Sequence, residues 1–330
     1  MTERSKWADT LRVVCSFMVV LLHCSIYGIF AKPLSLTWWF SNVYDGVCHL
    51  AVPVFFILSG YFYSYPHKKT YKKIAKAIFI YLAWTFFYTA FEFVLERDTE
   101  LLKALFNNLV HPYNHLWYLP AIIAVWLVAY FINFESDKTL YLAIVGLVAT
   151  SLYVYSGLIN KDFWWLTILY KFAYSMSFFI IGYKLKRINV TVKERRTGWG
   201  GFALAALVTV IGTGLLVKKD GSSTYPLYEY GALNVVIMAV CFFAIFINNN
   251  RSGKLTDFIR NTYKETLGIY LIHIAFRDFS FKMLTKLNIN TEYIINPIGI
   301  VVFALLIWII SKYIVMLCLR IPLVRELVKL

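Results

Sequence analysis

The sequence is poor in charged residues and lacks the motifs that mark the large families of soluble enzymes. Only 15% of its 330 residues are Asp, Glu, Lys or Arg, and 60% are hydrophobic, whereas a soluble domain is roughly 45–50% apolar. It contains no GxSxG, Walker A or HExxH motif and no ligand cluster with metal-binding spacing. These absences exclude the usual forms of serine-hydrolase, nucleoside-triphosphatase and zinc-protease chemistry, and we expect no metal cofactor.

Cysteine is scarce, and its placement argues against a disulfide framework. The five cysteines show no paired spacing and no CxxC motif. They fall in or beside apolar segments, where a free cysteine behaves as a small buried hydrophobic residue. This interpretation applies to Cys15, Cys24, Cys48, Cys241 and Cys318.

Long apolar runs, by contrast, are abundant. A run of about 20 apolar residues is long enough to cross a bilayer core of roughly 30 Å. We therefore predict an all-α fold, a polytopic membrane bundle of about ten transmembrane helices. The predicted spans cover residues 8–30, 45–64, 77–95, 115–133, 139–157, 166–185, 201–217, 229–248, 265–282 and 295–318.

The positive charges are distributed unevenly between the predicted loops. With the N-terminus in the cytoplasm, 21 of the 33 Lys and Arg residues lie in cytoplasmic segments and 8 in outer segments. This bias fits the positive-inside rule with both termini cytoplasmic, so the net charge of +15 reflects topology and does not indicate nucleic-acid binding. Because no linker, repeat or long outer loop is evident, we expect one integral-membrane domain, 1–330, with any chemistry inside the bundle.

The first predicted span carries the most informative polar residues. Asp9 and Arg12 are three residues apart and can pair on one helix face. Arg12 and His23 are eleven residues apart, so they share a face and are separated by roughly 16 Å along the axis. Charges inside a span cost at least a few kcal/mol and usually line a polar cavity or take part in chemistry. An interfacial ion pair with a core histidine is the alternative interpretation.

Three more histidines lie within predicted spans. His49 and His115 fall in the outer halves of their spans, as His23 does, so these three could face one outward cavity. His273 lies near mid-depth, four residues before Arg277. A neutral imidazole is a natural general base at neutral pH. An aromatic belt around His115 and a core role for His273 remain the alternatives.

The densest basic cluster lies in the loop after the second span. It contains Lys68, Lys69, Lys72, Lys73 and Lys76. Such loops usually contact the charged membrane surface. A phosphate clamp for an anionic donor on the cytoplasmic side is the sharper interpretation.

Taken in order, these residues resemble the membrane acyltransferase-3 family, in particular its short O-acetyltransferase members without an appended domain. The resemblance runs from residue 9 to the last span. It rests on four motifs: Asp9…Arg12…His23, Val52-Pro53-x-Phe55-Phe56-x-x-Ser59-Gly60-Tyr61, His115-Leu116-Trp117, and Gly268-Ile269-Tyr270-x-x-His273.

The resemblance implies a ten-helix acyltransferase in the bacterial inner membrane. Family members transfer an acyl group, usually acetyl, from cytoplasmic acyl-CoA to a hydroxyl of a surface sugar, polysaccharide or lipid-linked precursor. His23 aligns with the histidine regarded as catalytic, and Arg12 with the residue thought to hold the donor. Where family members often carry arginines after the Ser-Gly motif, this chain has lysines, which bind phosphate as point charges.

The predicted site follows from both lines of reasoning. We assign catalysis to His23 with Asp9 and Arg12, the first as general base or, alternatively, as the carrier of a covalent acyl group. Donor binding is assigned to Arg12, Lys68, Lys69, Lys72 and Lys73, and acceptor binding to His115, Trp117, Tyr270 and His273. A transporter of a small polar solute, such as an amino acid, is the alternative function. The sequence does not indicate the acceptor, the acyl group or the oligomeric state.

Overall fold

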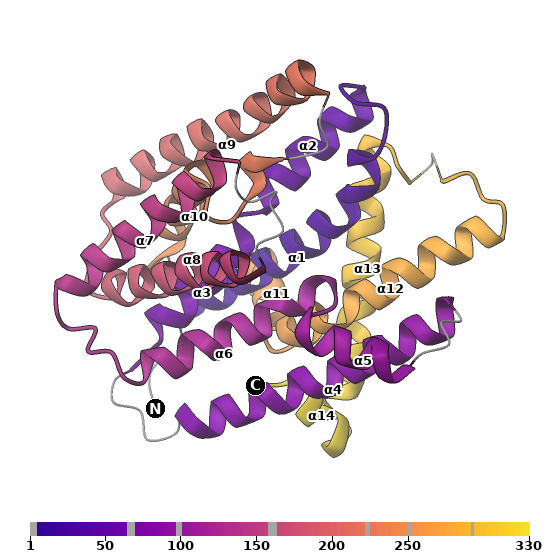
Figure 1. Ribbon diagram of the computed structural model, residues 1–330, viewed down its shortest axis with the longest axis horizontal. Helices are drawn as coiled ribbons and strands as arrows, with labels where there is room; N and C mark the ends of the chain where they lie inside the picture. The colour runs from indigo at the N-terminus through magenta and orange to yellow at the C-terminus, as the bar shows by residue number, and fades with distance from the viewer. Residues whose placement is uncertain are drawn as a thin grey trace. The chain divides into compact units, whose positions relative to one another are not determined.

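The computed structural model describes residues 5–64, 70–96, 101–157, 164–221, 225–249, 253–291 and 294–330, and these residues form helices and no strands (Figure 1). The elements are α1 Lys6–Ile29, α2 Leu36–Cys48, α3 Ala51–Tyr61, α4 Thr70–Glu96, α5 Leu101–Val110, η1 Asn114–Trp117, α6 Tyr118–Ala129, α7 Lys138–Tyr155, α8 Trp164–Leu185, α9 Val192–Asp220, η3 Pro226–Tyr228, α10 Leu233–Phe246, α11 Lys254–Arg260, η4 Asn261–Lys264, α12 Thr266–Lys286, α13 Pro297–Cys318 and α14 Pro322–Val328. The predicted all-α class is confirmed.

Eight helical segments in the described part of the chain are long and apolar enough to cross a membrane. They correspond to eight of the ten predicted spans. The other two are also helical, but the segment Asn114–Ala129 is shorter and α12 carries more charge. The structure therefore agrees with a polytopic helical bundle.

The chain divides into two compact units, each built from separate stretches of sequence. The first unit comprises Met1–Tyr63, Asn133–Tyr263 and Thr291–Leu305. The second unit comprises Ser64–Ile132, Lys264–Asn290 and Leu306–Leu330.

Small residues bring the helices of the first unit close together. A Cβ atom on Gly60 of α3 would lie 1.8 Å from the carbonyl oxygen of Phe179, and one on Gly182 of α8 would lie 2.0 Å from that of Ile57. This reciprocal contact brings α3 and α8 together, since small residues let helix backbones touch in membranes (Figure 1).

The second predicted span is longer than expected and is broken in the middle. α2 begins at Leu36, not near residue 45, because Ser35 caps it by accepting a hydrogen bond from the Trp38 amide. α2 then ends at Cys48 and α3 begins at Ala51. Pro53 explains the break, because a proline ring clashes with the carbonyl four residues earlier, here that of His49.

The second unit is tied together by hydrogen bonds from aromatic side chains of α4. The Tyr88 hydroxyl donates to the carbonyl of Leu271 in α12 at 2.7 Å. The Trp84 indole donates to the carbonyl of Leu327 in α14 at 2.9 Å. These bonds occupy carbonyls that lie near helix ends or on interhelical faces.

Candidate functional site

The ion pair expected on α1 is present. Arg12 Nη1 lies 2.9 Å from Asp9 Oδ1, and the Asp9 side chain is only 4% exposed. The guanidinium also lies over the Phe62 ring, 5.1 Å from its centroid. Trp7 packs against the same ring. Asp9 lies in the first turn of α1, where the helix dipole favours a negative charge. Arg12 is thus held in a fixed orientation with part of its side chain accessible.

The geometry of His23 fixes which ring nitrogen can accept a proton. His23 Nδ1 lies 2.8 Å from the carbonyl oxygen of Val19. A carbonyl only accepts hydrogen bonds, so Nδ1 of the neutral imidazole carries the proton and Nε2 carries the lone pair. His23 is partly exposed, which suits a general base.

The same bond recurs at two other histidines. His49 Nδ1 lies 2.7 Å from the carbonyl of Asp45, four residues earlier. His273 Nδ1 lies 3.0 Å from the carbonyl of Ile269, four residues earlier, and 2.8 Å from that of Tyr270, three residues earlier. The tautomer alone therefore does not distinguish a catalytic histidine from a structural one.

Three of the four residues assigned to acceptor binding meet in the second unit. The His115 ring lies 5.1 Å from the rings of both Tyr270 and His273. The Tyr270 hydroxyl donates to the His115 carbonyl, and Trp117 lies in η1 with His115. His115 is 3% exposed and His273 is 0% exposed. In this conformation the two histidines therefore position their neighbours, and their role toward the acceptor stays a prediction.

Sequence reasoning did not find the polar cluster beside these rings. Arg277 Nε lies 2.7 Å from Asp278 Oδ1, its sequence neighbour. The Tyr113 hydroxyl donates to the other oxygen of Asp278 at 3.4 Å. Burial raises the pKa of Tyr113, and the carboxylates of Asp278 and Glu92 raise it further. The hydroxyl therefore stays protonated, and the cluster gives Arg277 an acidic neighbour that the sequence left unassigned.

The basic loop extends into a helix. α4 begins at Thr70, not near residue 77, so Lys72 and Lys73 lie in its first turns. The Lys73 Nζ atom lies 4.1 Å from the centroid of the Trp126 ring. Lys68 and Lys69 lie outside the described residues. The clamp assignment remains a prediction.

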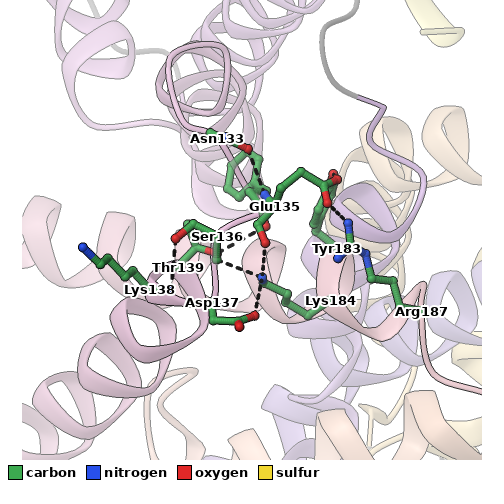
Figure 2. A network of polar contacts seen from close by, with 10 residues as sticks. Asn133, Glu135, Ser136, Asp137, Lys138, Thr139, Tyr183, Lys184 and Arg187 are labelled. Atoms are coloured by element: carbon green, nitrogen blue, oxygen red, sulfur yellow. Dashed lines mark hydrogen bonds and ion pairs between the residues drawn. The ribbon is translucent and has the colours of Figure 1, made fainter.

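Several other basic residues at the predicted cytoplasmic side have structural roles. Figure 2 shows the turn between α6 and α7 bound to the end of α8: the Tyr183 hydroxyl donates to Glu135 Oε1 at 2.6 Å, and Lys184 Nζ donates to the Ser136 carbonyl at 2.9 Å. Arg187 pairs with Glu135 in the same network. Arg195 donates to two carbonyls at the end of α10. These cations stabilise loops and helix ends of the first unit.

A second feature missed by sequence reasoning is the non-helical segment before α10. Residues 228–230 read Tyr-Glu-Tyr, and they run from the last residue of the short η3 turn toward α10. Glu229 accepts a hydrogen bond from the Tyr170 hydroxyl at 3.2 Å and lies near Lys171. Pro226 and Gly231 lie on either side of these three residues. Proline and glycine commonly interrupt helices, so they could have indicated a break in the predicted span that begins near residue 229.

The comparisons with known proteins bear on the whole chain. The sequence model of the acyltransferase-3 family, an acyltransferase domain, matches residues 5–316. The chain belongs to the acyltransferase-3 family. No curated protein and no solved structure shows a significant match to it. The family match includes parts of both compact units, and with the eight apolar helices it makes this acyltransferase-3 protein a multi-pass membrane acyltransferase.

Proposed function

We propose that this acyltransferase-3 protein is an acyl-CoA-dependent O-acyltransferase of the bacterial inner membrane. It moves an acetyl or other short acyl group from the cytoplasm to a hydroxyl of a surface sugar, polysaccharide or lipid-linked precursor. Family membership supports acyl transfer over transport of a polar solute. The observation that carries the proposal is that His23 is partly exposed and shares a helix face with Arg12, while its Nδ1–H bond to Val19 leaves Nε2 as the basic nitrogen.

The reaction at His23 is a direct acyl transfer. Nε2 takes the proton of the acceptor hydroxyl, and the oxygen attacks the thioester carbonyl carbon. The new C–O bond forms, the C–S bond breaks, and the thiolate of CoA leaves. The imidazolium returns its proton to that thiolate. Each turnover therefore regenerates neutral His23 and consumes no other reactant.

The donor enters from the cytoplasmic side in this proposal. Lys72 and Lys73 lie in the first turns of α4, and the first turn of this helix contains no acidic residue. Cations at a helix N-terminus are disfavoured by the helix dipole, whereas an anion there is bound by the first amide groups. The phosphates of CoA can bind both the lysines and the first amide groups of α4. Arg12 then guides the acyl-bearing arm over the roughly 16 Å to His23.

Replacement of His23 tests the proposal. We expect His23→Ala to lower the transfer rate from acetyl-CoA by about 10²–10⁴-fold, the usual contribution of a general base. Stabilisation of the detergent-solubilised protein by acetyl-CoA should persist, because the donor binds elsewhere. Near-normal transfer by folded His23→Ala protein would reject the assignment. Stabilisation of the wild type by a small polar solute but not by acetyl-CoA would favour transport.

A further inference from the structure

The segment 229–232, between η3 and α10, is unusual because its backbone is not helical although it lies within an apolar span, Pro226–Phe246. Irregular backbone at membrane depth is tolerated only where protein buries it or where it lines a polar cavity. The segment thus needs partners from other helices, and the first unit supplies them.

Side chains from four helices hold this segment and the adjoining η3 turn in place. The Gly231 amide donates to the Tyr170 hydroxyl at 2.9 Å, and Ser151 donates to the Gly231 carbonyl at 2.7 Å. Asn234 donates to the Leu227 carbonyl at 2.6 Å. Tyr228 is bonded to Asn42 of α2. A backbone fixed at so many points presents its remaining side chains in a preorganised arrangement.

Those side chains form a row of rings beside two carboxylates. The Tyr228 ring stacks on His49 at 5.1 Å with 25° between the planes, and the Tyr230 ring centroid lies 5.4 Å from that of His49. The Asp45 carboxylate lies 3.6 Å from His49 Nδ1. Glu229, Tyr230 and His49 are each partly exposed.

This row lies at the depth of His23. In the antiparallel pair α1 and α2, Gly28 faces Ser41, because a Cβ on Gly28 would come to 1.9 Å from the Ser41 hydroxyl. His23 lies five residues, about 7.5 Å, before Gly28, and Asp45 lies four residues, about 6 Å, beyond Ser41. His23 and Asp45 both lie on the side of the Gly28–Ser41 contact that is farther from the α1–α2 loop. Their depths along the helices therefore differ by less than one helical turn.

We propose that Asp45, His49, Glu229 and Tyr230 form the binding site for the saccharide acceptor. This inference rests on the proposed acyl transfer. Aromatic faces pack against the apolar face of a sugar ring, and carboxylates accept hydrogen bonds from its hydroxyls. Lys171 lies near Glu229 and balances one of the two carboxylates, and the rings and hydrogen-bond acceptors suit a polyhydroxyl ligand.

The test uses membranes of the source cells, which contain the native acceptor. Membranes carrying wild-type or variant protein receive radiolabelled acetyl-CoA, and base-labile label in the envelope saccharide is counted. We expect Glu229→Gln to lower the initial rate about tenfold or more, as expected for the loss of one charge-assisted hydrogen bond. The KM for acetyl-CoA and the stabilisation by acetyl-CoA should stay within about twofold of wild type, because the donor does not contact this site.

Two further variants guard against a folding defect. Lys171→Gln/Glu229→Gln removes both charges together, and Tyr230→Leu removes a ring while keeping both carboxylates; both should lose transfer and keep donor binding. Glu135→Gln makes the same chemical change in the network at the end of α8 and should leave the rate unchanged. Wild-type rates in Glu229→Gln and Tyr230→Leu would overturn the acceptor site alone. Wild-type membranes that transfer no label and gain no stability from acetyl-CoA would overturn the proposed function as well.

Discussion

The pair Asp9–Arg12 allows a structural role of Arg12 to be separated from a role in donor binding. The change Arg12→Gln removes the guanidinium that lies 2.9 Å from Asp9, whose side chain is 4% exposed. Loss of one member of a buried ion pair costs about 3–5 kcal/mol. Because the Arg12 side chain is itself 32% exposed, we expect the lower end, about 3 kcal/mol.

The single change Arg12→Gln leaves the buried Asp9 carboxylate without its counter-ion. The double change Asp9→Asn/Arg12→Gln removes both charges and therefore this energetic cost. We expect it to recover most of the free energy of unfolding, measured by reversible denaturation in mixed micelles. Transfer from acetyl-CoA should remain low in both variants, since a glutamine does not replace a cation toward the donor.

Recovery of transfer together with stability in the double variant would refute this reasoning, because Arg12 would then serve only to neutralise Asp9. Arg187→Gln is the matched control. Arg187 pairs with Glu135, but its side chain is 55% exposed. Such surface pairs contribute about 0–1 kcal/mol, so the control should change neither stability nor transfer.

Three other predictions follow from the packing and the charges. Lys72→Ala/Lys73→Ala should raise the apparent KM for acetyl-CoA several-fold with kcat nearly unchanged, and an unchanged KM would reject the phosphate clamp. Gly60→Ala should cost about 1–3 kcal/mol or more of unfolding free energy through overpacking against α8, whereas Gly200→Ala, with open space around it, should be neutral or stabilising; equal stabilities would contradict the close helix contact. Lys76 of α4 pairs with Glu326 of α14, and this bond lowers the pKa of Glu326. A lowered carboxyl pKa stabilises the folded state above the usual value of about 4.3 and ceases to do so as the pH falls below it. Amide exchange in α14 should therefore be faster relative to α4 at low pH, and a constant ratio would count against this contact.

Short-range relations could be predicted from the sequence. The ion pair of Asp9 with Arg12 needs only the geometry of one helix, and the apolar runs need only composition. The close contact at Gly60 also follows from residue size. These features depend on neighbours within a few positions, so a pattern in the sequence is enough to indicate them.

The positions where helices begin, and the hydrogen bonds between residues far apart in the sequence, could not be predicted in the same way. α2 gains nine residues before the predicted start at residue 45 because Ser35 caps it. The segment at Glu229 is fixed by Tyr170, 59 positions away, and by Asn42, 186 positions from Tyr228. Nothing near Glu229 in the sequence identifies these partners. The candidate acceptor site therefore became visible only once the helices were packed.

Access, and not the tautomer, distinguishes the histidines of this protein. His23, His49 and His273 all donate Nδ1–H to the carbonyl four residues earlier, so each directs a basic Nε2 away from its own helix. A base must also reach the hydroxyl that it deprotonates. His115 and His273 are enclosed by aromatic rings at 3% and 0% exposure, whereas His23 and His49 are partly exposed. Of these two, His23 shares its helix face with Arg12, toward the donor side, and His49 lies among the rings and carboxylates suited to a sugar. Deprotonation by His23 and orientation of the acceptor by His49 is therefore the division of roles that this geometry favours.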